Sequence, residues 1–155
     1  TLLLLGIGFE GAELNPQKII KQDEYLYLIA QTFEYSPIPL YKISDLTEAE
    51  KNNIEQQLRL RGVLLKDEKM VNQEITREEA IKYLVRALGH GEIASHTEIF
   101  KLNINDSKNV SEKYTGYVAI GDALSIIIKD EQNNFNPQSK ITRDEALKMV
   151  YNYLK

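Results

Sequence analysis

Two segments of the chain read ITREEA (residues 75–80) and ITRDEA (residues 141–146). Each opens a run in which apolar residues recur at intervals of three and four, the spacing of one face of a helix. After the first segment these apolar residues are Ile81, Leu84, Val85 and Leu88. The repeated pattern therefore predicts two helices, over residues 77–88 and 143–154.

The threonine and the glutamate of each segment match the capping-box pattern, in which Thr precedes Glu by three positions at a helix start. We expect Thr76 to accept a hydrogen bond from the backbone N–H of Glu79, and Glu79 to accept one from the N–H of Thr76. Thr142 and Glu145 repeat the pattern. Such a cap contributes about 1 kcal/mol to helix stability, so these four residues are predicted to be structural.

The two segments belong to longer repeats. ISD at residues 43–45 and IND at residues 104–106 form a matched pair upstream of them. A further match places LNPQ at residues 14–17 over FNPQ at residues 135–138. Such internal repetition is typical of modules whose units pack against one another. We predict one compact domain over residues 1–155, with repeat units at 1–36 (incomplete at its N-terminus), 37–91 and 92–155.

Three more segments have helical periodicity, at residues 22–33, 48–61 and 112–128. The second follows a further capping pair, Thr47 and Glu50. Strand signals are poor, because the chain contains no Asn-Gly or Asp-Gly hairpin dipeptide and its alternating apolar and polar runs are short. The predicted fold class is all-α.

The arginine of each segment is not explained by capping. Arg77 and Arg143 would occupy the first helical position, where the helix dipole disfavours a cation. One explanation is an ion pair with a neighbouring carboxylate, such as Asp45 or Asp106. The other is a carboxylate-binding site, in which the helix N-terminus and the guanidinium donate to one anion. The residues themselves leave both explanations open.

Composition excludes several function classes. The chain has 155 residues with a formal net charge of −4, which argues against binding to nucleic acid. No stretch approaches the roughly 20 apolar residues of a membrane-spanning helix, so no membrane insertion is expected. Cysteine is absent, which removes disulfides, thiol nucleophiles and cysteine-based zinc sites.

Candidate metal and catalytic residues are few. His90 and His96 are six positions apart, which gives poorly aligned faces of a helix, and glycines at 89 and 91 indicate a loop. We interpret both histidines as solvated loop residues and expect no metal site. The chain also lacks the Gly-x-Ser-x-Gly motif of hydrolases. We predict a protein that is not an enzyme and needs no cofactor.

Taken in order, these motifs resemble the S-layer homology repeat of bacterial cell-surface proteins. That repeat reads Phe-x-Asp, a Trp-bearing helix, Gly-Ile-Ile-x-Gly, Phe-x-Pro and Ile-Thr-Arg-x-Glu. The third unit follows it almost throughout, at residues 104–106, 114–120, 125–128, 135–137 and 141–145. The second unit keeps Asp45, residues 62–64 and residues 75–79. The first unit keeps residues 6–7, 14–16 and 20, but has Lys21-Gln22 where Thr-Arg is expected.

The resemblance implies an arrangement and a function. Repeats of this family pack around a pseudo-threefold axis with three helices in a central bundle, and the grooves between repeats bind ligand. The implied ligand is secondary cell-wall polysaccharide that carries pyruvylated amino sugar, with the motif arginine at the pyruvate carboxylate. The implied role is non-catalytic anchoring of a larger exported protein at the extracellular cell wall or S-layer.

The chain departs from the family pattern in two respects. It contains no Trp, and the first unit has Gln22 at the arginine position. We expect Tyr114 or Tyr117 to supply the missing stacking surface. The predicted ligand-binding residues are Arg77, Arg143, Asp45, Asp106, Tyr114 and Tyr117. The alternative is a diverged module for structure or protein association that has lost carbohydrate binding.

Overall fold

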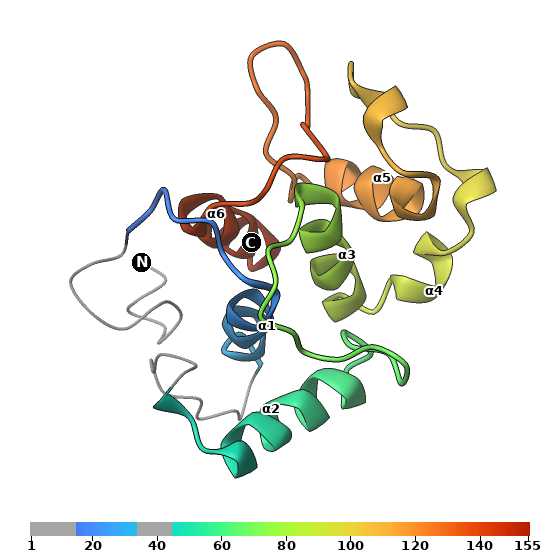
Figure 1. Cartoon of the computed structure of the whole chain (residues 1–155). Helices are drawn as coiled ribbons and strands as arrows, with labels where there is room; N and C mark the ends of the chain where they lie inside the picture. Colours follow the sequence, from blue (N-terminus) through green and yellow to red (C-terminus); the bar gives the residue numbers. More distant parts are fainter. Residues whose placement is uncertain (1–14, 34–44) are drawn as a thin grey trace.

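The computed structural model describes residues 15–33 and 45–155. Within these residues the regular structure is helical and contains no strand (Figure 1). The six α-helices are α1 (Gln22–Ala30), α2 (Glu48–Leu60), α3 (Arg77–Ala87), α4 (Gly91–Ala94), α5 (Thr115–Ala123) and α6 (Arg143–Tyr153). Short 3₁₀ turns η3 (Thr97–Ile99), η4 (Ser107–Asn109) and η5 (Glu112–Tyr114) connect α4 to α5. The predicted all-α class is confirmed for this part of the chain.

The helix that we predicted over residues 112–128 is shorter than expected. η5 forms its first turn, and α5 ends at Ala123. Ser125 follows with φ at +57°, a left-handed conformation that stops a helix and that glycine usually supplies. Gly62, which follows α2, has φ at +69°. Ser125 therefore does after α5 what Gly62 does after α2, and the sequence did not signal it.

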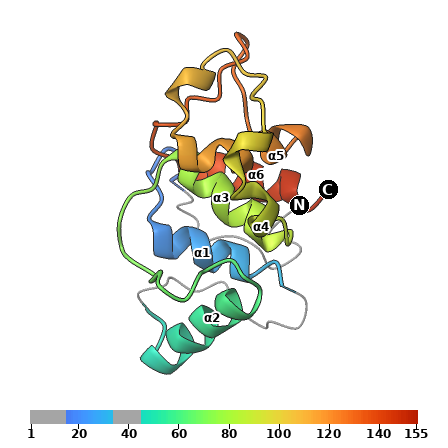
Figure 2. The same ribbon diagram turned by 90° about the vertical axis from the view of Figure 1, so that its right-hand side faces the viewer.

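The core is built on α1, α3 and α6, which contact one another in all three pairs. α1 is the most enclosed of them: Tyr25, Leu26, Leu28, Ile29 and Ala30 are fully buried. α2 packs on α1, and α5 packs on α3, so these two helices lie outside the central three (Figures 1 and 2). The apolar faces of three helices thus form one core, because none of them could bury its stripe alone.

Backbone hydrogen bonds join the starts of the three central helices in a cyclic order. Gln22 N, at the start of α1, donates to Gln73 O, just before α3. The equivalent bonds run from α3 to the segment before α6 and from α6 to the segment before α1, as Arg77 N to Ser139 O and Arg143 N to Lys18 O. The first N–H groups of a helix have no partner within it, so each helix start here is satisfied by the segment that precedes another of the three central helices.

The parts of the first unit at residues 6–7 and 14 lie outside the described residues, as do residues 43 and 44 of the second unit.

Candidate functional site

The capping residues of α3 and α6 have the same geometry. Glu79 N lies 3.3 Å from Thr76 Oγ1, and Thr76 N lies 2.7 Å from Glu79 Oε2. At α6, Glu145 N lies 3.3 Å from Thr142 Oγ1, and Thr142 N lies 3.0 Å from Glu145 Oε2. In both caps the glutamate uses one carboxylate oxygen, Oε2, for its own helix start.

Arg77 is buried, with 5% of its surface exposed, and it uses three of its donors. Nε donates to Phe135 O at 2.7 Å, and Nη2 donates to Ile128 O at 2.5 Å. Nη1 donates to Glu145 Oε1 at 2.5 Å, the oxygen that the cap of α6 leaves free for it. The guanidinium therefore joins the second repeat unit to both the loop and the helix start of the third.

Arg143 makes the same kind of contact at the next junction. Its Nη2 donates to Glu24 Oε1 at 3.0 Å, while Glu24 Oε2 accepts from the backbone N–H of Lys21 at 3.0 Å. The side chains of Arg143 and Glu24 are 13% and 16% exposed. We refer to the two ion pairs Arg77–Glu145 and Arg143–Glu24 as the clasps.

The clasps give a physical reason for a cation at the first position of α3 and α6. Each motif arginine pairs with the capping glutamate of another unit, so the ion pair offsets the unfavourable helix dipole. The sequence suggested Asp45 or Asp106 as the partners. Asp106 instead accepts from Phe135 N at 2.9 Å and from Asn136 N at 2.6 Å, and Asp45 is exposed just before α2.

At the start of α1, Gln22 stands where the other two units have arginine. Its amide nitrogen donates to Lys69 O and to the Tyr83 hydroxyl, both at 3.1 Å. Its amide oxygen accepts from Val71 N at 2.7 Å. Neutral hydrogen bonds thus take the place of a clasp at the junction of the first and second units.

A pocket of about 740 Å³ lies between α3 on one side and η5 and α5 on the other. Two of the predicted ligand residues, Tyr114 and Tyr117, line it, whereas the other four are not among its lining residues. Three hydroxyl groups, those of Ser95, Thr97 and Ser111, also face it. We call this the α3–α5 pocket.

The charged residues of the α3–α5 pocket are three cations and two carboxylates: Lys82, Arg86, Lys113, Glu68 and Glu112. Lys82 Nζ and Arg86 Nη1 lie 3.0 and 2.7 Å from the two carboxylate oxygens of Glu68. Lys113 is exposed, and its Nζ lies 4.9 Å from the centre of the Tyr114 ring. Cations and hydroxyl-bearing residues thus line one wide opening, to which Tyr114 and Tyr117, 7% and 6% exposed, contribute little surface.

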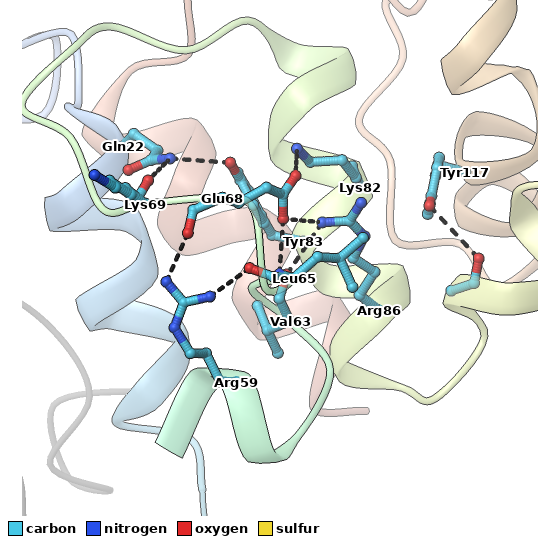
Figure 3. A network of polar contacts seen from close by, with 11 residues as sticks. Gln22, Arg59, Val63, Leu65, Glu68, Lys69, Lys82, Tyr83, Arg86 and Tyr117 are labelled. Atoms are coloured by element: carbon cyan, nitrogen blue, oxygen red, sulfur yellow. Dashed lines mark hydrogen bonds and ion pairs between the residues drawn. The ribbon is translucent and has the colours of Figure 1, made fainter. Parts of the chain in front are cut away.

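Glu68 organises this region, and the sequence did not single it out. Arg59 of α2 donates to Glu68 O and to Leu65 O, and Leu65 N donates to the Glu68 carboxylate (Figure 3). Burial raises the pKa of Glu68, but the bond from Leu65 and the charges of Lys82 and Arg86 outweigh it and hold the pKa below its ordinary value. Glu68 therefore stays ionised and keeps both α3 cations in place.

The second pocket, of about 380 Å³, lies between α1, α2 and the loop before α3. Its charged lining consists of three carboxylates and one lysine: Asp23, Glu48, Glu55 and Lys51. No aromatic residue lines it among those described. We call this the α1–α2 pocket.

Thr142→Ala is expected to lower the free energy of unfolding by about 1 kcal/mol, because Glu145 N loses its acceptor at the start of α6. Thermal melts of the two proteins measure the difference. Thr142→Ser keeps the hydroxyl and is the control. A serine variant that melts as early as the alanine variant would show that the lost methyl group, and not the cap, causes the effect.

Comparison with known families places one match on this region. The profile of the S-layer homology domain matches residues 103–147, which run from before η4 through α5 into α6. The resemblance found in the sequence is therefore confirmed for this segment. No curated protein matches the chain.

Residues 15–33 and 45–155 contain no helix with the length and the apolar character needed to cross a bilayer. They also contain no cluster of three or more His, Asp or Glu side chains that could hold a metal ion.

Proposed function

We propose that this chain binds secondary cell-wall polysaccharide without catalysis and thereby holds a larger exported protein at the bacterial surface. The proposal starts from residues 103–147, an S-layer homology domain, which implies anchoring at the cell wall. The α3–α5 pocket is the observation on which this proposal depends, since Tyr114 and Tyr117 lie inside the matched domain.

The chemistry of the α3–α5 pocket suits a charged sugar. A tyrosine ring offers apolar surface for the C–H face of a pyranose and a hydroxyl for its polar edge. Of Tyr114 and Tyr117, 7% and 6% of the surface is exposed for such a contact. Ser95, Thr97 and Ser111 supply further hydroxyl groups. Those of Ser95 and Ser111 donate to Glu92 O and to the Glu78 carboxylate, both at 2.6 Å, so they meet a saccharide as acceptors. Lys82, Arg86 and Lys113 supply the positive charge that a pyruvyl carboxylate requires.

We also propose that the repeat units 1–36, 37–91 and 92–155 form one domain around a pseudo-threefold axis. The cyclic order of the backbone bonds between helix starts supports this arrangement. The clasps follow the same order, from the second unit to the third and from the third to the first. A shared axis would make each junction between units an equivalent groove.

A direct role for Arg77 and Arg143 in binding the pyruvyl carboxylate stays a prediction. At Arg143 the ligand would have to replace Glu24, and at Arg77 it would have to replace Glu145. Arg143 is the more accessible of the two, with 13% of its side chain exposed against 6%. A ligand that exchanges with a clasp would loosen the junction that the clasp joins.

The competing function is a structural or protein-association module without carbohydrate binding. The absence of Trp and the presence of Gln22 at the arginine position favour it. Gln22 is satisfied by three neutral hydrogen bonds, so the fold has adapted to the loss of a cation at this position.

A pull-down on purified wall polysaccharide separates the two functions. The chain is expected to bind native polysaccharide and to lose most of that binding when the pyruvyl groups are removed, because the cations then lack their anion. Circular dichroism checks that the protein used is folded. Absence of binding to both polysaccharides would support the association module instead.

A further inference from the structure

The two pockets occupy corresponding places in the repeat but have opposite charge. Each lies between a motif helix and the helix of the following unit, α3 with α5 and α1 with α2. The correspondence holds at the helix starts, where Glu78 N donates to Pro137 O and Asp23 N donates to Val71 O. Cations outnumber carboxylates in the α3–α5 pocket, whereas carboxylates outnumber the single lysine in the α1–α2 pocket.

The three cations of the α3–α5 pocket differ in whether they form ion pairs. Lys82 and Arg86 share the carboxylate of Glu68. Lys113 contacts the ring of Tyr114 and, within the described residues, forms no ion pair. An exposed cation on an aromatic ring can turn toward an anion without breaking an ion pair, so Lys113 is the charge that a ligand can engage at least cost.

The α1–α2 pocket lacks both features. Its lysine, Lys51, lies 3.1 Å from Glu48, and Glu55 is paired with Arg59 at 2.5 Å. Asp23 is the lining carboxylate that forms no ion pair among the described residues, so the opening keeps an excess of negative charge. No aromatic ring among the described residues offers a stacking surface there. A saccharide carboxylate entering this pocket meets charges of its own sign, which disfavours binding.

We infer that the chain binds acidic saccharide at one of these two pockets only, the α3–α5 pocket, and that Lys113 is the residue that selects the negative charge. This inference rests on the proposed function and deepens it, because it names which of these two pockets takes the ligand and the residue that selects it. The α1–α2 pocket keeps the shape of a groove between units and rejects the anionic ligand.

Titration calorimetry of the full chain with a soluble pyruvylated fragment of wall polysaccharide tests the inference. Lys113→Gln is expected to weaken binding about tenfold, the effect of losing one charge-assisted hydrogen bond. Lys51→Gln makes the same charge change on a lysine of the other pocket and is the matched control, with no expected change in affinity.

A second titration, with the fragment from which pyruvate has been removed, measures how much of the affinity depends on the carboxylate of the ligand. Lys113→Gln is expected to change the affinity for this neutral fragment much less, because no carboxylate is present to select. An equal loss of affinity for both fragments would show that Lys113 contributes to binding independently of the carboxylate, and would overturn its assigned role.

Failure of the inference differs from failure of the proposed function. A loss for Lys51→Gln equal to that for Lys113→Gln would overturn the single-pocket inference while carbohydrate binding stands. No binding of either fragment by the unsubstituted chain would overturn the proposed function, and the inference with it.

Discussion

Arg77→Ala is expected to lower the free energy of unfolding by about 3 kcal/mol, at the lower end of the cost of breaking a buried ion pair from one side. The substitution removes the partner of Glu145 and leaves the carbonyls of Phe135 and Ile128 without their donor. The expected loss is not larger because the Glu145 side chain is 31% exposed and can be hydrated in part. Urea unfolding followed by circular dichroism measures it.

A double-mutant cycle with Glu145→Gln separates the clasp from the other bonds of Arg77. Glutamine can still accept the capping bond from Thr142 N, so Glu145→Gln removes the charge and keeps the helix start. If the clasp is an ion pair, the two substitutions are expected to couple by about 1 kcal/mol or more. Additive effects would contradict the clasp and leave the two carbonyl bonds as the role of Arg77.

Phe135→Ala is expected to cost about 3–5 kcal/mol, the range for removing a fully buried aromatic side chain. Phe135 has 0% of its surface exposed, and its ring lies 5.2 Å from the Arg77 guanidinium carbon. Its backbone also joins two units, because its N–H donates to Asp106 and its carbonyl accepts from Arg77. The loss should appear in the midpoint of urea unfolding.

Phe135→Leu is the control, since it keeps most of the buried volume and is expected to cost less than about 1.5 kcal/mol. Unfolding midpoints of both variants close to that of the unsubstituted chain would show that the backbone bonds, rather than the buried ring, hold this loop.

Local patterns in the sequence were sufficient to predict where four of the helices begin. α1, α2, α3 and α6 begin at residues 22, 48, 77 and 143, where periodicity and capping residues predicted them. These signals work because a cap and an apolar stripe involve residues three or four positions apart. α5 ended early because Ser125 adopts a conformation that its residue type does not announce. α4 escaped prediction because it is one turn long, too short for a periodic pattern. It packs against α5 at Gly116, where Ala94 O leaves no room for a side chain.

The sequence predicted some of the residues that line the candidate site, but not which residues contact one another there. Tyr114 and Tyr117 were predicted to be ligand residues, and both line the α3–α5 pocket. Glu68, which holds two cations of that pocket, was missed because its loop has no motif and its partners lie 14 and 18 positions away.

The sequence by itself determined the all-α class, the starts of α1, α2, α3 and α6, the caps of α2, α3 and α6, and the S-layer homology segment, because each of these depends on neighbouring residues or on an ordered set of motifs. Only the tertiary structure decided what the motif arginines contact. Arg77 and Glu145 are 68 positions apart, and Arg143 and Glu24 are 119 positions apart. Such pairs form only after the repeat units have packed, since packing sets which carboxylate oxygen remains within reach of each guanidinium.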